Sequence, residues 1–279
     1  MDPRTYWAEQ LDEAHAFMQR LLAHPIREAR EPMCSLTRLA RDCGVRIDCP
    51  SGKKLGFLER TFWVRRSVAE RLVAVAEAML EHDRVLRVED AWRSIDIQIQ
   101  GAGCDFILDT VHRKVLWERR GEPPGIDLLM RRISVLTATT PKFANHTSGS
   151  AVDISVLRRN DGGDLDRGGP YLELSEKTPM ASPFISEQAQ RNRAWINETM
   201  GDHGFHAYPY EFWHYSFGDV DWAVLTGEER PAPYGPVDFS PETGAVIPVA
   251  DERLLEPLLP RERVSEYLER AGRTSSGGP

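Results

Sequence analysis

Residues 143–154 read FANHTSGSAVDI, and this stretch guides the interpretation of the whole chain. A histidine, His146, and an aspartate, Asp153, stand seven residues apart with Gly149 between them. After the glycine, residues 151–156 alternate apolar and polar side chains, which is the pattern of a half-buried strand. The sequence therefore predicts a turn that holds His146, followed by a strand that carries Asp153.

A second stretch, residues 208–215, reads YPYEFWHY and adds Glu211 and His214. Pro209 and the aromatic residues around it argue against a helix, so we expect Glu211 and His214 on a strand or at a strand end. Two histidines, one aspartate and a spare glutamate make up the residue set of a catalytic zinc site. Each residue taken alone has an ordinary structural explanation, except Asp153, because an aspartate inside an apolar strand must be paired or bind a metal.

The chemistry of such a site assigns a role to each of these residues. A catalytic zinc ion takes three protein ligands and leaves one position for water or substrate. His146, Asp153 and His214 supply nitrogen and oxygen donors, a mixture that suits zinc better than a hard ion that prefers oxygen alone. Glu211 is then available as the general base. Arg93, at the end of a predicted strand, is the candidate for stabilising negative charge on the carbonyl oxygen.

The composition is that of a globular protein. The chain has 279 residues, which allows one large domain or two small ones, and a core of sufficient size can form without disulfides. Its formal net charge of -8 argues against a nucleic-acid partner, because phosphates bind to a basic face. No stretch approaches the ~18 apolar residues of a membrane span, and the N-terminus does not read as a secretory signal. We therefore expect a cytoplasmic protein without a membrane partner; its oligomeric state stays unknown.

Cysteine usage leaves two interpretations open. The four cysteines form no CxxC pair, and three of them fall within sixteen residues: Cys34, Cys43, Cys49 and Cys104. A structural zinc knuckle is one interpretation of that cluster. Reduced, scattered thiols are the interpretation that we favour.

The remaining chain predicts helices around a few strands. The clearest helix spans residues 67–83, where Ser67 and Glu70 are placed as a capping box. Further helices are predicted at residues 5–30, 96–118, 126–136, 186–200 and 251–271, strands at 85–94, 151–156 and 208–218, and loops at 31–60 and 158–185. This order indicates an α+β fold in which a small antiparallel sheet carries the zinc site and helices flank it.

The two motifs together resemble the paired signature SxHxxGxAxD and ExWH of the zinc D-Ala-D-Ala metallopeptidases, which include D-alanyl-D-alanine dipeptidases and carboxypeptidases. In this chain the motifs read HTSGSAVD and EFWH. Residues 88–94 with Gln98 resemble the DGYRSxxxQ segment of the family, and residues 172–178 resemble its dipeptidase branch in particular. The similarity covers about residues 62–224.

The resemblance implies the roles that the residue chemistry had suggested. It implies one Zn²⁺ per chain, held by His146, Asp153 and His214, with Glu211 as catalytic base and Arg93 at the scissile carbonyl. It also implies a small peptide substrate. The residues that we expect to contact this substrate are Trp92, Asn145, Ser148, Glu173 and Trp213.

The chain departs from the family pattern at two places near the expected substrate. Ala144 stands where the family often has serine, two residues before the first histidine. Leu172 stands where the dipeptidases of glycopeptide resistance have an aspartate that holds the ammonium group of the substrate. Glu173 or Asp166 would then have to neutralise that ammonium group when it is buried.

These departures leave the function open between four alternatives. We favour a zinc dipeptidase acting on D-Ala-D-Ala or a related small dipeptide. The others are a carboxypeptidase or cell-wall endopeptidase, a peptidase or amidase of a specialised pathway, and a zinc-binding relative without activity. The presence of both Glu211 and Arg93 argues against the last of these.

We expect three parts along the chain. Residues 1–60 form an N-terminal helical and loop extension, and residues 61–226 form the metallopeptidase domain. Residues 227–279 form a Pro-rich C-terminal extension with a short helix and a disordered tail.

Overall fold

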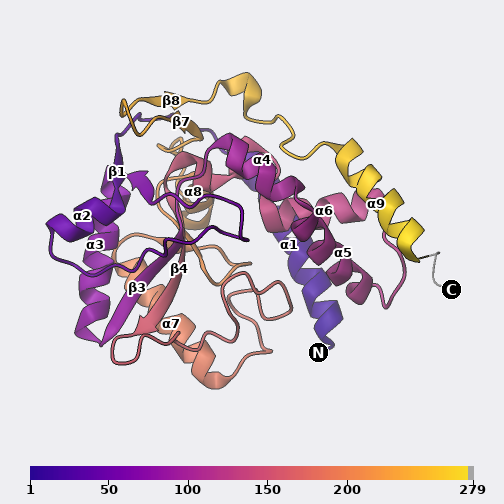
Figure 1. Cartoon of the computed structure of the whole chain (residues 1–279), viewed down its shortest axis with the longest axis horizontal. Coiled ribbons are helices and arrows are strands. Elements are labelled where there is room, and N and C mark those ends of the chain that lie inside the picture. The colour runs from indigo at the N-terminus through magenta and orange to yellow at the C-terminus, as the bar shows by residue number, and fades with distance from the viewer. Residues whose placement is uncertain (276–279) are drawn as a thin grey trace.

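A computed structural model of the chain describes residues 1–275, with side chains to residue 272. Four strands form its central sheet: β3 (Arg84–Asp90), β4 (Ala151–Arg158), β5 (His206–Ala207) and β6 (His214–Ser216). They pair antiparallel in the order β3-β4-β6-β5 (Figure 1). With helices on either side of this small sheet, the predicted α+β class is confirmed.

The register of the sheet brings distant residues together. β4 lies between β3 and β6 and is buried along its length except at Arg158. Asp153 of β4 stands opposite His214 of β6 on one side and opposite Asp90 of β3 on the other. The register of β3 shifts between Val88 and Asp90, and such an irregularity re-aims the side chains at the end of a strand.

Two helices cover the sheet. α3 (Arg66–Glu81) packs on β3, and α7 (Glu187–Asp202) packs against α3 and β5. The core between them consists of fully buried side chains, among them Val68, Leu72, Val75, Met79, Leu86, Ile154 and Tyr215. Burial of this apolar face stabilises α3 much more than the local preference of its residues does.

The start of α3 differs from the prediction. The helix begins at Arg66, so Ser67 lies inside it and does not cap it, and the predicted Ser67–Glu70 capping box is wrong. A residue distant in sequence satisfies the free backbone group instead, because Glu31 accepts a hydrogen bond from the Ser67 N–H at 2.6 Å.

A second group of helices lies beside the sheet (Figure 1). It contains α1 (Pro3–Ala23), α4 (Ile95–Gly103), α5 (Asp105–Glu118), α6 (Ile126–Thr137) and α9 (Arg261–Ser275). Leu108, Leu129 and Ile133 form its core, and Leu259 and Val264 from the C-terminal part of the chain pack into it. Helices from both ends of the chain therefore pack against the middle part; the division into three parts stays a prediction.

The other elements show where local patterns were insufficient. Residues 96–118 form two helices, α4 and α5, with a break at Cys104. Residues 31–60 are not all loop, because they contain β1 (Met33–Ser35) and α2 (Leu36–Asp42), and β1 pairs with β2 (Trp63–Arg65). The predicted helices at residues 126–136 and 186–200 are confirmed as α6 and α7.

The C-terminal part continues with short elements. They are α8 (Val220–Thr226), a hairpin of β7 (Val237–Phe239) and β8 (Val246–Pro248), and a 3-10 turn, η3 (Asp251–Arg253). The helix predicted at residues 251–271 is thus η3 followed by α9. From residue 276 on, the tail predicted to be disordered lies outside the described residues, and Ser275 ends α9.

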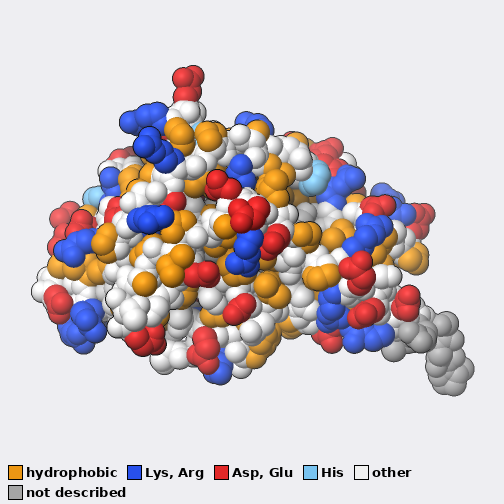
Figure 2. Space-filling view, turned by 90° about the horizontal axis from the view of Figure 1, so that it is seen from above, with side chains coloured by type: hydrophobic (Ala, Val, Ile, Leu, Met, Phe, Trp, Pro, Cys, Tyr) orange, Lys and Arg blue, Asp and Glu red, His pale blue; other side chains and the backbone are white. Residues whose placement is uncertain are grey.

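The surface mixes both signs of charge. On the face that Figure 2 shows, acidic and basic side chains stand close together, with hydrophobic ones scattered among them. Among the described residues, no helix is both long enough and apolar enough to cross a membrane.

Candidate metal centre

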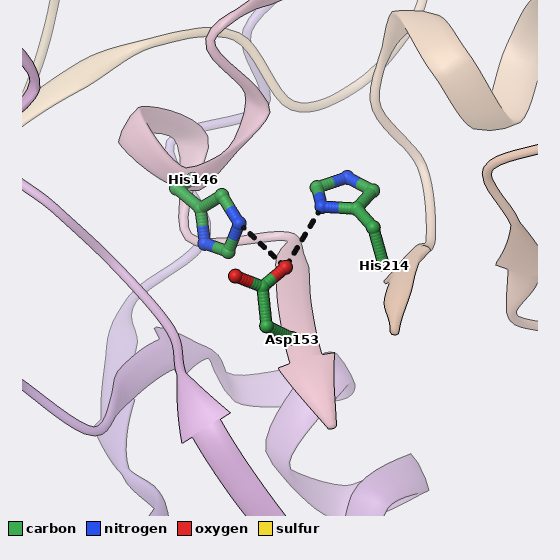
Figure 3. A group of neighbouring side chains, drawn as sticks. All are labelled: His146, Asp153 and His214. Carbon is green, nitrogen blue, oxygen red and sulfur yellow. Dashed lines mark hydrogen bonds and ion pairs between the residues drawn. The ribbon is translucent and has the colours of Figure 1, made fainter. Parts of the chain in front are cut away.

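The three predicted ligands meet at one end of the sheet (Figure 3). His146 comes from the 3-10 turn η2 (Asn145–Ser148), Asp153 from β4 and His214 from β6. Asp153 Oδ1 lies 3.1 Å from His146 Nε2 and 3.1 Å from His214 Nδ1, and the three ligand atoms lie within 4.8 Å of one another. A tetrahedral zinc site with bonds of ~2.1 Å separates its ligand atoms by about 3.4 Å, so the spacing fits a metal ion.

A backbone hydrogen bond determines which nitrogen of His146 faces the site. His146 Nδ1 lies 2.7 Å from the carbonyl oxygen of Ala91, which can only accept, so Nδ1 carries the proton. In the neutral ring, Nε2 then directs a lone pair at Asp153 Oδ1, which also offers a lone pair. Two lone pairs 3.1 Å apart repel each other unless a cation lies between them. A metal ion held by both atoms removes this repulsion.

Gly149 makes the turn between the two ligands possible. Its φ of 75° lies in the left-handed region that favours glycine. An added Cβ would lie 2.5 Å from Met33 Cε and 3.5 Å from the backbone nitrogen of Arg65. Gly149 ends η2, and β4 begins two residues later. The predicted arrangement, with His146 in a turn and Asp153 on the following strand, is confirmed.

The second oxygen of Asp153 lies among three groups, two of which the sequence analysis did not identify. Tyr171 donates its hydroxyl to Asp153 Oδ2 at 2.7 Å, and Lys54 Nζ lies 3.7 Å from the same oxygen. Arg93 Nη2 also donates to it, at 3.3 Å. Burial alone would raise the pKa of Asp153, but its contacts with His146 and His214 and the charge of Lys54 hold it well below its ordinary value. The carboxylate is therefore charged, as a metal ligand must be.

Arg93 is held as a fixed positive charge on the wall of the site. Its Nε donates to Asp90 Oδ2 at 2.8 Å and its Nη1 donates to Gln98 Oε1 at 3.1 Å. Lys54 Nζ donates to the same Asp90 oxygen at 2.8 Å. Gln98 in turn donates to the carbonyl oxygen of Ala138 at 3.0 Å. These contacts restrict the guanidinium, which is what an electrostatic role at a reacting carbonyl requires.

Glu211 lies in the loop between β5 and β6, and not on a strand or at a strand end as we expected. The N–H of Tyr208 donates to the carbonyl of His214 and closes this loop, and the N–H of His214 donates to the carbonyl of Glu211. Pro209 has no N–H and cannot continue a strand ladder. Burial, reinforced by the charge of Asp153, raises the pKa of Glu211 to about 7, where a general base works well at neutral pH.

A cavity of about 200 Å³ opens onto these groups. Its lining includes the polar side chains Lys54, Asp90, Arg93, His146, Asp153, Glu211, His214 and Asp221. Of the five predicted substrate contacts, Asn145 and Trp213 also line it. The lining does not include Trp92, Ser148 or Glu173.

Those three side chains have other neighbours in the fold. The ring of Trp92 packs edge-on against Phe239 at 5.4 Å. Ser148 donates its hydroxyl to the carbonyl of Asn145 and supports the η2 turn. Glu173 lies over Gly169, where an added Cβ would be 3.0 Å from its Cγ.

Asp221 is a cavity carboxylate that the sequence analysis missed. It lies in the first turn of α8, is 5% exposed, and no lysine or arginine among the described residues forms an ion pair with it. Burial, followed by the charge of Asp219, raises its pKa. Neither α8 nor a motif around Asp221 was predicted, so no local pattern pointed to this residue.

The cysteines are separate from this site. All four are free thiols, and the metal-binding group found among the described residues contains none of them. This agrees with the favoured interpretation of reduced, scattered thiols.

The chain is similar to dipeptidases of known function. It is 36% identical to the D-alanyl-D-alanine dipeptidase of Escherichia coli over 72 residues, which are 26% of this chain and 37% of that enzyme. It is 34% identical to the D-alanyl-D-alanine dipeptidase of Synechocystis over 97 residues, which are 31% of this chain and 39% of that enzyme. A solved LD-carboxypeptidase aligns over 75% of this chain and 79% of its own, with a TM-score of 0.38 and 15% identity.

A buried His-Asp-His set beside a glutamate and a fixed arginine has the residue types of a catalytic metal site. Residues 129–226 match the sequence model of a family described as D-ala-D-ala dipeptidase, and they contain His146, Asp153, Glu211 and His214. The similarity to the D-Ala-D-Ala metallopeptidases is therefore shown for this part of the chain. The matches of the chain span less than two fifths of the length of these two curated relatives.

The hydroxyl of Tyr171 offers a test of the metal site. The Tyr171→Phe change removes the hydrogen bond to Asp153 Oδ2 and leaves the ring against Trp213. Because partners of metal ligands tune the metal, we expect zinc affinity to fall about 10- to 100-fold, as measured by competition with a chelator. Tyr210→Phe, outside the cavity lining, is the matched control. Equal zinc affinity in Tyr171→Phe and wild type would show that Tyr171 does not support the ligand.

Proposed function

We propose that this chain is a zinc-dependent dipeptidase that hydrolyses the amide bond of a small D-amino-acid dipeptide such as D-Ala-D-Ala. The observation that carries the proposal is the buried set of His146, Asp153 and His214 with Glu211 in the same cavity. The match of residues 129–226 to the D-ala-D-ala dipeptidase family supports it.

The mechanism follows from the positions of the polar groups. The three ligand side chains would hold the zinc ion, which supplies Lewis acidity beside the scissile carbonyl. Glu211 takes a proton from the attacking water and passes it to the amine nitrogen as the C–N bond breaks. Arg93, held by Asp90, offers positive charge to the carbonyl oxygen as that oxygen gains negative charge. The products are a carboxylate and a free amine.

The ammonium group of a free dipeptide needs a carboxylate when it is buried. Neither Glu173 nor Asp166, which the sequence suggested, belongs to the lining of the cavity. Asp221 does, and it has no lysine or arginine partner among the described residues. Asp221 is therefore the residue that we assign to the substrate ammonium in this proposal.

An assay with three substrates tests the function. Zinc-loaded protein is offered D-Ala-D-Ala, L-Ala-D-Glu and a muramyl pentapeptide, and the products are measured by chromatography. We expect cleavage of the free D-dipeptide and no cleavage of the pentapeptide. Cleavage of the pentapeptide alone would instead identify a carboxypeptidase or endopeptidase. No cleavage of any of them would leave a specialised peptidase or a zinc-binding protein. The cytoplasmic location is part of this proposal, and fractionation of cells that produce the protein checks it.

A further inference from the structure

The cavity has a second, apolar side. α4, α5, α6 and the loop of residues 54–59 supply it, and in Figure 1 these helices lie beside the sheet that carries the metal ligands. We call this side the apolar wall. It consists of Leu55, Leu58, Ile97, Gly101, Ala102, Phe106, Ile107 and Leu136. The same cavity contains the candidate ligands and Glu211, so the apolar wall and the metal site line one space.

Gly101 keeps space open within the apolar wall. A glycine inside a helix is unfavourable relative to alanine, and Gly101 lies in α4, two residues before its end. A Cβ added there would lie 3.5 Å from Leu58 Cδ1, which is an ordinary contact. There is therefore room for a Cβ beside Leu58, and Gly101 itself lines the cavity.

The loop that faces the metal site is apolar as well. Leu172 and Leu174 line the cavity, whereas Glu173 between them does not. Leu172 has a φ of 65°, a left-handed conformation that is costly for a leucine. Phe106, also in the lining, is 54% exposed, so its ring extends the apolar lining to the surface.

We propose that the apolar wall receives a bulky apolar side chain of the substrate. The preferred dipeptide then carries a leucine-sized or larger group next to the scissile bond, and D-Ala-D-Ala is cleaved less efficiently than that dipeptide. The two methyl side chains of D-Ala-D-Ala would leave most of the wall in contact with water. Each further methylene of a substrate side chain that is buried against the wall favours binding. This inference rests on the proposed function, from which it takes the cleaved bond, the amide bond of a dipeptide.

The first measurement compares D-Ala-D-Ala with D-Leu-D-Ala and D-Ala-D-Leu. We expect kcat/KM of the zinc-loaded enzyme to be at least about tenfold higher for one leucine dipeptide, since even one methylene changes kcat/KM by about tenfold or more. The better of the two shows on which side of the scissile bond the wall lies. Values within about threefold of one another would contradict a specificity role.

Two glycine variants show whether the wall causes the preference. Gly101→Leu places a large side chain in the apolar wall. We expect it to lower the ratio of kcat/KM for the leucine dipeptide to kcat/KM for D-Ala-D-Ala about tenfold. Gly201→Leu is the matched control, because Gly201 lies in α7 and a Cβ added there meets no atom within 4 Å. Both changes replace a helical glycine with leucine, so thermal melting should show neither variant to be less stable. An unchanged ratio in Gly101→Leu would overturn the proposal.

A binding measurement separates this inference from the proposed function. Calorimetry with zinc-loaded Glu211→Gln protein gives the affinities of the same three dipeptides without cleavage. The wall is supported if one leucine dipeptide binds more tightly than D-Ala-D-Ala and if adding Gly101→Leu weakens that binding at least about tenfold. This holds even if the wild-type protein hydrolyses none of the three dipeptides. If D-Ala-D-Ala is hydrolysed and all three dipeptides bind with equal affinity, the specificity role of the wall is wrong and the proposed dipeptidase activity stands. Absence of both binding and hydrolysis would overturn both.

Discussion

Replacing His146 with alanine is expected to remove zinc from the protein and to abolish hydrolysis. His146 Nε2 and Asp153 Oδ1 point at the same place from 3.1 Å apart, and the alanine variant leaves only Asp153 and His214 to hold the ion. A catalytic zinc site needs three protein ligands. Removal of a hydrogen-bond partner of a ligand lowers metal affinity by about 10- to 100-fold. We expect a larger fall in zinc affinity here, because a ligand itself is removed. Metal analysis after dialysis against a weak chelator measures this loss.

The matched control for this variant is His206→Ala. His206 lies on β5 of the same sheet, is exposed, and does not belong to the cavity lining. We expect this variant to keep its zinc and its activity. The metal-free forms of wild type and His146→Ala should be compared by thermal melting, because the substitution also removes the hydrogen bond to Ala91. Undiminished zinc in a folded His146→Ala protein would exclude His146 as a ligand.

The ligands were predictable because short local patterns carry them. Gly149 and the alternation after it placed His146 in a turn and Asp153 on a strand, and both placements are confirmed. The motif around His214 added the third ligand. What the sequence could not supply was the register that puts Asp153 opposite His214, since the two are 61 residues apart.

The residues that support the site were not predictable, and the reason is tertiary. Lys54 and Tyr171 lie in segments without helical or strand periodicity, so no local pattern places them. Lys54 meets Asp90 from 36 residues away, and Tyr171 meets Asp153 from 18 residues away. Such contacts depend on how loops pack on a finished sheet.

The same distinction between local patterns and tertiary contacts explains the errors in the predicted fold. α7 follows from a capping serine, Ser186, which accepts a hydrogen bond from the N–H of Ala189, and a local signal of this kind is readable in sequence. The start of α3 depends instead on Glu31, and the apolar wall depends on α4, α5 and α6 packing against one another. Neither arrangement has a local signature, so the wall could be seen only in the structure.

Replacing Glu211 with glutamine is expected to lower kcat by about 10²- to 10⁴-fold while zinc stays bound. The amide keeps the size of the carboxylate but cannot accept the proton of the attacking water. Glu211 lines the cavity with His214 and is not part of the metal-binding group. The substitution also replaces a buried carboxylate with a neutral group, so the free energy of unfolding should not fall.

The kinetic and metal measurements together determine what Glu211 does. Glu173→Gln is the matched control, because that side chain is outside the cavity lining and should leave kcat unchanged. If Glu211→Gln lost its zinc, Glu211 would be a ligand and the base would have to be another group. If the variant kept both zinc and full activity, proton transfer by Glu211 would be excluded. Only a large fall in kcat with one zinc ion still bound per chain agrees with a base that acts on water beside the metal, because the two functions then belong to different side chains of one cavity.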